Sequence, residues 1–358
     1  MYTFCHHFLA RIHVCRPTQW RKHITCLPSF QGSTSLSATY SKSPSNRDVT
    51  WVYEHPNIKS RLKTLGMHHM SATEHPHSIT VGMPGFRPDE YDNKFGLVRV
   101  KYIITRGTLA LTYVNNVPYN SEGDTFLDWL KVRNIPGATI FNGSTKVEFY
   151  KSLYDPKTPI EHIEATYNLG KVGKSTCAFV ADFRNGDERG ESLWKQTTQF
   201  VRIDEKSMRP SPFPEWFKDK FSGKGIPGCQ GFVMRPFKRP EDTYVYDIKV
   251  RLSDIDSHNH THSISYVDFA QSAVYSALTS PRDASKASSH IKALEGFTEK
   301  RARNGMKRLE VLYQSESQEG QELKVHVWQS EDDADNVVRC SIEGDGGVVC
   351  QLLLEAHD

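Results

Sequence analysis

The chain of 358 residues is long enough for two domains of ordinary size. Hydrophobic residues make up 37% of it and charged residues 24%, as is usual for soluble proteins, and no apolar run of about 18 residues predicts a membrane span. The formal net charge of +3 is too small to indicate a nucleic-acid-binding protein.

The first 47 residues differ in charge from the rest of the chain. They contain six Lys and Arg residues among many Ser, Thr and His but no acid, and Asp48 is the first acidic residue. An acid-free start with arginine and serine is typical of an organelle transit peptide. We therefore expect residues 1–47 to direct import into the mitochondrial matrix, with a plastid as the second choice and a disordered basic tail as the alternative.

The first half of the chain carries a strand, a helix and four more strands in its pattern. Residues 48–89 are an N-terminal extension without an assigned structure. Alternation predicts a strand over 96–104, and a helix follows with Asp124 as its N-cap before "TFLDWLKV". Residues 90–205 are therefore expected to form the first domain. Its further strands are predicted at 145–152, 159–168, 175–184 and 191–203.

A linker separates this domain from a second one. Residues 206–240 carry six Pro and four Gly, a density of breakers that indicates an interdomain segment. Residues 241–358 then repeat the order of the first half, with a strand at 246–252 and a helix over 264–278. Its further strands are predicted at 307–316, 321–329, 336–343 and 347–355.

The two halves also share a short sequence. "NGSTKVEF" at 142–149 and "NGMKRLEV" at 304–311 align without a gap. A strand, a mostly apolar helix and a run of antiparallel strands describe a sheet wrapped around a central helix, the hotdog architecture. We predict an α+β chain with two such units in tandem, a double hotdog. Duplicated β-sandwiches or barrels are the alternative, and the helix before the long sheet argues against them.

A stretch just before the second predicted helix combines acids and imidazoles. "SDIDSHNHTHSISY" at 253–266 carries two Asp and three His at alternating positions. With the residues before it, the stretch resembles the signature of acyl-acyl-carrier-protein thioesterases and related hotdog thioesterases. The matching positions are Ser253, Asp254, Ile255, Asp256, His260 and Tyr266, and the departures are His258, His262 and Ser263.

The resemblance implies a site and a reaction. It places Asp256, His258 and His260 in the active site, with His258 where the family has Asn, and it implies a later Glu, for which "VLYQSES" offers Glu316. The implied reaction is hydrolysis of a fatty acyl thioester, carried by acyl-carrier protein or CoA, to the free fatty acid. It needs no metal or organic cofactor, and a homodimer of double hotdogs is compatible with it.

The residue types are chemically compatible with the reaction that the resemblance implies. A thioester carbonyl is already electrophilic, so its hydrolysis needs an aimed water, a base and hydrogen-bond donors for the oxyanion. Asp256 is a candidate base or nucleophile, and His260 is placed to orient the water or to donate to the developing charge. The N-terminus of the helix over 264–278 favours negative charge. A tunnel beside this helix would hold the acyl chain.

The first half lacks this signature. The region we match to it, "TYVNNVPYNSEGD" at 112–124, offers Asn115 and Asn116 but no Asp-x-x-x-His. We therefore expect the first half to be a non-catalytic partner that forms one wall of the acyl tunnel.

Three alternatives remain open for the motif. His258, His260 and His262 would share one side of an extended segment and so form a zinc site, although a turn into the helix would break that alternation. Asp254 is expected to be a turn or cap residue. An inactive hotdog module that binds acyl chains or acyl-carrier protein is the alternative function.

The seven cysteines form no C-x-x-C pair and favour buried thiols in a reducing compartment.

Overall fold

The computed structural model describes residues 66–72, 77–92, 94–120, 123–186, 190–256, 259–279, 294 and 296–358. The predicted transit peptide lies outside these residues, and so does His258.

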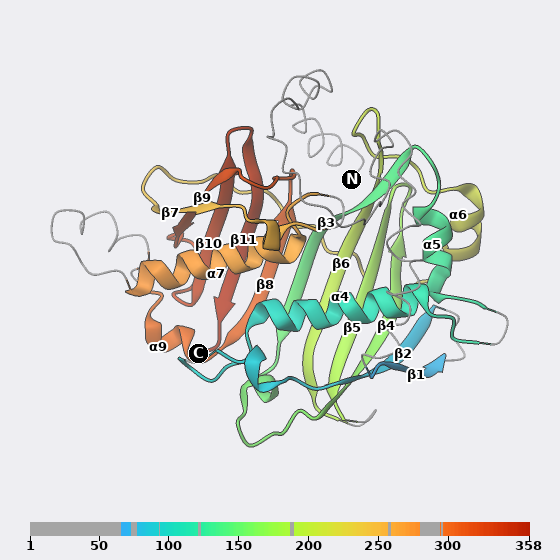
Figure 1. Ribbon diagram of the computed structural model, residues 1–358, viewed down its shortest axis with the longest axis horizontal. Helices are drawn as coiled ribbons and strands as arrows, with labels where there is room; N and C mark the ends of the chain where they lie inside the picture. Colours follow the sequence, from blue (N-terminus) through green and yellow to red (C-terminus); the bar gives the residue numbers. More distant parts are fainter. Residues whose placement is uncertain are drawn as a thin grey trace, which may run out of the picture.

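The described residues form one antiparallel sheet of eleven strands, in the order β1-β2-β4-β5-β6-β3-β8-β11-β10-β9-β7 (Figure 1). The first half supplies β1 His68–Ala72, β2 Ser78–Pro84, β3 Ala138–Phe149, β4 His162–Val172, β5 Thr176–Asn185 and β6 Ser192–Asp204. The second half supplies β7 Tyr244–Lys249, β8 Met306–Tyr313, β9 Glu322–Trp328, β10 Val337–Gly344 and β11 Gly347–Ala356. The eight long strands predicted from the alternation are all present.

The strand order shows that the chain is duplicated. Read outward from the centre, β3-β6-β5-β4-β2 of the first half repeats as β8-β11-β10-β9-β7 of the second. The central strands β3 and β8 pair from Ser144–Leu312 to Glu148–Arg308. The similar segment at 142–149 lies in β3, and the one at 304–311 continues into β8 from Met306. A pseudo-twofold axis therefore passes between β3 and β8, and the two half-sheets join into one.

Two long helices lie over the same face of this sheet, one for each half (Figure 1). They are α4 Val100–Asn116 and α7 Ser263–Thr279. The second confirms the helix predicted over 264–278. Each half is thus a sheet with a central helix, and the predicted double hotdog is confirmed. The short helices are η2 Pro88–Glu90, η3 Phe126–Asp128, α5 Trp129–Arg133, η4 Lys151–Tyr154, α6 Glu215–Phe221, η5 Leu252–Asp254 and α9 Glu299–Ala302. Among the described helices, none is long and apolar enough to cross a membrane.

The central helix of the first half is not where the sequence predicts it. The strand predicted over 96–104 is wrong because α4 starts at Val100, and the residues after Asp124 form only η3 and α5. Residues 100–105 are rich in Val, Ile and Thr, which locally favour a strand. The buried positions nevertheless follow helical spacing, so packing against the sheet decides. These positions are Val100, Ile103, Ile104, Gly107, Ala110, Tyr113 and Val114.

A glycine lets α4 approach the sheet closely. A Cβ at Gly107 would lie 2.6 Å from Gln196 Oε1 on β6. Tyr167 on β4 donates its hydroxyl hydrogen bond to the Gly107 carbonyl at 2.5 Å. The helix is therefore seated directly on the strands at this point, because a larger side chain would push it away.

The unassigned N-terminal extension and the predicted linker both contribute to the first half. Within the unassigned extension, β2 pairs with β4, so the sheet begins before residue 90. Within the linker, Phe217 and Phe221 of α6 are buried, and Ser144 on β3 donates to the Phe232 carbonyl at 2.6 Å. The Pro- and Gly-rich segment therefore packs along the first half up to Phe232, and it reaches the second half at Phe237, which exchanges hydrogen bonds with Gln351 on β11.

Candidate active site

The histidine-rich motif forms a tight turn between β7 and α7. Ile255 and Thr261 pair at the base of the turn through an isolated bridge. Inside it, Asp256 N donates to the His260 carbonyl at 2.8 Å, and Asn259 N donates to the Asp256 carbonyl at 3.1 Å. Asn259 has a φ of 62°, a left-handed conformation that Asn adopts more readily than most residues. The turn thus holds Asp256 and His260 together, immediately ahead of α7.

Two neighbours of the turn have capping roles. Asp254 accepts the Arg251 N–H on Oδ2 at 2.8 Å, and its carbonyl accepts the His262 N–H at 2.7 Å, which agrees with the predicted cap. His262 Nδ1 accepts the Ile264 N–H at 3.2 Å in the first turn of α7. Burial lowers the pKa of His262, against the opposing effect of the Asp256 charge. A neutral imidazole is the form that can accept this hydrogen bond.

The imidazole of His260 meets the carboxylate of Glu316. His260 Nε2 lies 3.1 Å from Glu316 Oε2, which follows the end of β8, and the two side chains are 21% and 36% exposed. Asp256 Oδ1 accepts the His260 backbone N–H at 3.4 Å. The structure therefore brings together three of the four residues that the sequence places in the site. His258 lies outside the described residues, and its place there stays a prediction.

This contact sets the chemistry that the imidazole can perform. When the neutral ring donates Nε2–H to Glu316, Nδ1 becomes its proton acceptor. A carboxylate in this position also stabilises the imidazolium that forms when Nδ1 takes up a proton. Such an arrangement can serve general-base chemistry, because the carboxylate holds the imidazole in one tautomer.

A buried hydrogen-bond network fastens Glu316 to the turn. Ser317 is 0% exposed, so each of its polar groups needs a partner within the protein. Its carbonyl accepts the Thr261 N–H at 2.8 Å, and its hydroxyl lies 2.7 Å from the Thr261 hydroxyl. Tyr266 of α7 accepts the Ser317 N–H on its hydroxyl oxygen at 3.1 Å. Burial raises the pKa of Tyr266 to about 12, so this hydroxyl stays protonated at neutral pH.

The network was only partly readable from the sequence. Tyr266 stands at a motif position, whereas Ser317 and Thr261 carry no signal of their own in one sequence. Ser317 directly follows Glu316, and Thr261 directly follows His260, so the hydrogen bond between them fixes the two parts of the site relative to each other. We call Thr261, Tyr266 and Ser317 the serine clamp.

Other catalytic chemistries find little support among the described residues. No three His, Cys, Asp or Glu side chains gather there as metal ligands, and the zinc alternative needs His258. Burial raises the pKa of the Cys177, Cys340 and Cys350 thiols, which disfavours the reactive thiolate. These three cysteines are the buried thiols that the sequence predicts.

The first half has its own copy of the turn, at residues 87–99. An isolated bridge joins Tyr91 to Val98, as Ile255 joins Thr261 in the second half. Asp92 N donates to the Leu97 carbonyl at 2.8 Å, the counterpart of the bond between Asp256 and His260. The residue before Leu97, Gly96, has a φ of 69°, close to that of Asn259. The two turns therefore share one hydrogen-bonding frame.

This frame corrects the predicted equivalence of the halves. "TYVNN" at 112–116 is the C-terminal end of α4, so Asn115 and Asn116 are not the counterparts of the motif. Asp92 stands at the Asp256 position and Leu97 at the His260 position. A signal was present in the sequence, because "EYD" at 90–92 matches "DID" at 254–256 as acid, hydrophobic residue and acid.

Comparison with known proteins finds similarity in solved structures, while no family model and no curated protein matches the chain. The 12:0-ACP thioesterase from Umbellularia californica is similar with a TM-score of 0.54 and 15% identity, over 78% of this chain and 97% of its own. A structure described as an oleoyl thioesterase from Lactobacillus plantarum has a TM-score of 0.53 and 15% identity, over 78% and 95%. This protein thus shares the double hotdog fold of these acyl thioesterases.

Proposed function

We propose that the protein hydrolyses fatty acyl thioesters to the free fatty acid and the carrier thiol. The observation that carries the proposal is the 3.1 Å contact between His260 and Glu316 on the turn that also holds Asp256. The fold shared with solved thioesterases supports the same reaction class by analogy.

In the proposed reaction a water molecule attacks the thioester carbonyl. His260 takes the water proton on Nδ1 while Glu316 holds Nε2–H and balances the imidazolium charge. The C–S bond breaks as the tetrahedral intermediate collapses, and the imidazolium returns the proton to the leaving thiolate. Water is thus consumed, and a carboxylic acid and a thiol are released.

Asp256 has an assisting role in this scheme. Its Oδ1 accepts a backbone N–H of its own turn, so its carboxylate holds the shape that presents His260. The notion that Asp256 is itself the base or the nucleophile is the competing assignment, and the variants below distinguish the two. The N-terminus of α7 begins three residues after His260 and favours the negative charge of the oxyanion.

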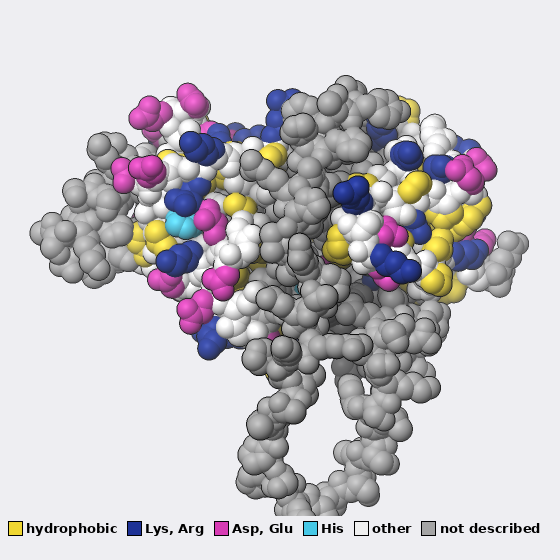
Figure 2. Space-filling model, turned by 90° about the horizontal axis from the view of Figure 1, so that it is seen from above, with side chains coloured by type: hydrophobic (Ala, Val, Ile, Leu, Met, Phe, Trp, Pro, Cys, Tyr) yellow, Lys and Arg dark blue, Asp and Glu magenta, His cyan; other side chains and the backbone are white. Residues whose placement is uncertain are grey.

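The carrier and the setting belong to the same proposal. An acyl-carrier protein or CoA would carry the acyl chain, and the mitochondrial matrix is the expected compartment because of the acid-free residues 1–47. On the face shown in Figure 2, Lys and Arg side chains alternate with Asp and Glu over the described residues. This face gives no preference for one acidic carrier over the other.

The test is release of free thiol from a panel of acyl-carrier-protein and acyl-CoA thioesters of different chain lengths. Glu316→Gln is expected to lower the rate about tenfold or more, because a neutral amide does not balance the imidazolium. Glu319→Gln is the matched control, since Glu319 is exposed in the same loop. If Asp256→Asn falls much further than Glu316→Gln, Asp256 is the base or the nucleophile.

Two outcomes would overturn parts of the proposal. Equal rates in Glu316→Gln and Glu319→Gln would remove the proposed His260 and Glu316 pair from the reaction. If the parent cleaves no thioester of the panel while it still binds acyl chains, the protein is the inactive binding module, and the proposed hydrolysis is wrong.

A further inference from the structure

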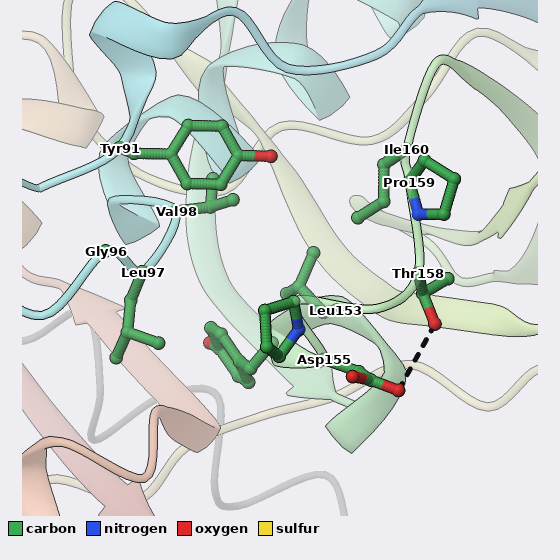
Figure 3. Close-up of a pocket in the computed structure, with 11 residues that line it drawn as sticks. Tyr91, Gly96, Leu97, Val98, Leu153, Asp155, Thr158, Pro159 and Ile160 are labelled. Atoms are coloured by element: carbon green, nitrogen blue, oxygen red, sulfur yellow. Dashed lines mark hydrogen bonds between the residues drawn. The ribbon is translucent and has the colours of Figure 1, made fainter.

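A cavity of about 290 Å³ lies beside the first-half turn. Tyr91 and Leu97 of the turn form one wall, and the segment from Leu153 to Ile160 after β3 forms the other. Figure 3 shows the Tyr91 hydroxyl directed across the opening, with Asp155 and Thr158 on the opposite rim. The cavity is therefore enclosed by the same two elements, turn and post-strand segment, that form the candidate active site in the second half.

The counterparts of the proposed catalytic pair line this cavity. Leu97 stands at the His260 position in the shared hydrogen-bonding frame. The register that aligns Asn142 with Asn304 places Tyr154 at the Glu316 position, and Tyr154 is also in the lining. At the positions that match the proposed catalytic pair, the first half thus has a cavity lined by two side chains that supply no base.

The walls of the cavity favour one class of ligand. Leu97, Leu153 and Ile160 offer apolar surface for methylene groups. The Tyr91 hydroxyl is a hydrogen-bond donor, and burial together with the Glu90 charge raises its pKa, so it stays protonated. The Asp155 carboxylate, which Figure 3 shows turned toward Thr158 at the rim, is an acceptor. A donor and an acceptor in the lining of one cavity match the C=O and N–H of a secondary amide.

Charge disfavours two other occupants. The cavity of about 290 Å³ has room for a chain with one or two amides. Asp155 at the rim would repel a fatty acid carboxylate or a phosphate. A neutral arm of methylenes and amides remains.

The acceptor and the turn are held in place before any ligand arrives. Asp155 Oδ1 accepts the Lys157 N–H at 2.9 Å, and Thr158 donates to Asp155 Oδ2 at 3.4 Å. On the other wall, Lys94 of the turn lies 2.7 Å from Glu299 and above the ring of Tyr275 of α7. A preformed site of this kind spends little free energy on ordering its own groups.

We propose that this first-half cavity is a second, non-hydrolytic binding site for the pantetheine-type arm of the thioester carrier. The ligand class rests on the proposed function, because the carrier arm is shared by the thioester substrates. Because Leu97 and Tyr154 in its lining supply no base, an arm bound here is held without cleavage of a thioester.

The test is equilibrium dialysis of the full chain against labelled pantetheine, which carries no thioester to cleave. Leu97→Trp fills the cavity and is expected to remove one bound equivalent. Tyr91→Phe removes the donor and is expected to weaken that equivalent about two- to tenfold. Val233→Trp, at an exposed position of the linker, adds the same indole elsewhere and is expected to bind like the parent.

The outcomes separate this inference from the proposed hydrolysis. A folded Leu97→Trp protein that binds as much pantetheine as the parent would overturn the second site, whatever the hydrolysis assay shows. If Leu97→Trp does not fold, an unchanged affinity in Tyr91→Phe overturns it. Loss of one equivalent in a protein that cleaves no thioester leaves the site standing and the hydrolysis wrong.

The source of the arm is tested by competition. Coenzyme A and a holo acyl-carrier protein carry the same arm, and the one that displaces one more equivalent of pantetheine from the parent than from Leu97→Trp is the carrier that reaches the cavity. Failure of both to compete would also overturn the proposal.

Discussion

The turns before α4 and α7 have the same backbone hydrogen bonds but different side chains. In both, an isolated bridge closes the turn and an Asp N–H donates across it. In both, a residue in the left-handed conformation precedes the position at which the side chains differ most in chemistry. The second half has His260 there and the first has Leu97. Because both turns carry an aspartate, Asp92 or Asp256, a carboxylate on the turn does not by itself distinguish the half that we propose to be catalytic.

The packing beneath the two turns differs as well. In the first half, Glu90 is buried and lies 2.7 Å from Arg106 on α4. In the second, the matching acid Asp254 is partly exposed, and the position on α7 that matches Arg106 is the buried Phe269. The first-half turn is therefore anchored by an ion pair, and the second by apolar packing and the serine clamp.

The largest effect is expected from making the second turn like the first. His260→Leu removes the proposed base, and hydrolysis should fall by about 10²- to 10⁴-fold, the usual contribution of a general base. The turn should keep its fold, because Leu97 occupies the same position in the first half. Thiol release together with circular dichroism checks both. A folded His260→Leu protein with the parental rate would contradict the proposed role of His260.

The ion pair of the first half should matter for stability. Arg106→Met leaves Glu90 buried without its cation and is expected to cost about 3 kcal/mol in the free energy of unfolding. Lys101→Met is the matched control on the same helix, because the side chains of its pair with Asp268 are 38% and 45% exposed and the pair should contribute less than about 1 kcal/mol. Urea unfolding of both variants measures the difference.

A double variant separates the charge from the packing. Glu90→Gln combined with Arg106→Met removes both charges, so it should unfold at a higher urea concentration than Arg106→Met alone. If the double variant is the less stable of the two, the buried charge is not the source of the loss.

The serine clamp should connect stability with turnover in the second half. Ser317→Ala removes the hydroxyl that meets Thr261 and Tyr266, at a cost of about 1–2 kcal/mol. Because Glu316 is the preceding residue, we also expect kcat to fall severalfold with a smaller change in KM. Ser315→Ala, two residues away and exposed, is the control. A kcat that stays parental in Ser317→Ala would show that the clamp only stabilises the fold.

The strands of both halves were predictable because their pattern is strong and local. β5, β6, β10 and β11 alternate between turn signals, and each was found within about two residues of its expected ends. The central helix of the first half was not, because the Val, Ile and Thr residues of 100–105 favour a strand until the sheet is present to receive them. The local sequence pattern does not show that this segment will pack against the sheet.

The candidate site was predictable only where residues are close in sequence. Asp256 and His260 lie on one turn, so a single sequence motif contains both and predicts both. Glu316 came from resemblance, and its 3.1 Å contact with His260 depends on the fold. Ser317 lies 56 residues from Thr261, and no periodicity relates them. The copy at 87–99 was missed because a misplaced helix shifted the match between the halves to 112–124.

The smallest effect concerns the residue between the turn and α7. His262 caps α7 with Nδ1, whereas its counterpart in the first half is Arg99, which cannot cap in this way. Burial lowers the folded-state pKa of His262 below its ordinary value of about 6.5. On acidification the unfolded chain therefore binds this proton first, so the contribution of His262 is present above pH about 6.5 and is lost as the pH falls through the folded-state pKa.

His262→Asn should reveal this contribution because Asn keeps an acceptor at a helix N-terminus but does not titrate. Between pH 7.5 and 5.5 the parent should lose more unfolding free energy than the variant, by up to about 1 kcal/mol. Both proteins should still lose some stability, because burial also lowers the pKa of His162, His326 and His357. Thermal midpoints across this range provide the measurement. Parallel curves would mean that the cap of α7 does not depend on the protonation state of His262, and the two turns would then differ in chemistry but not in their response to acid.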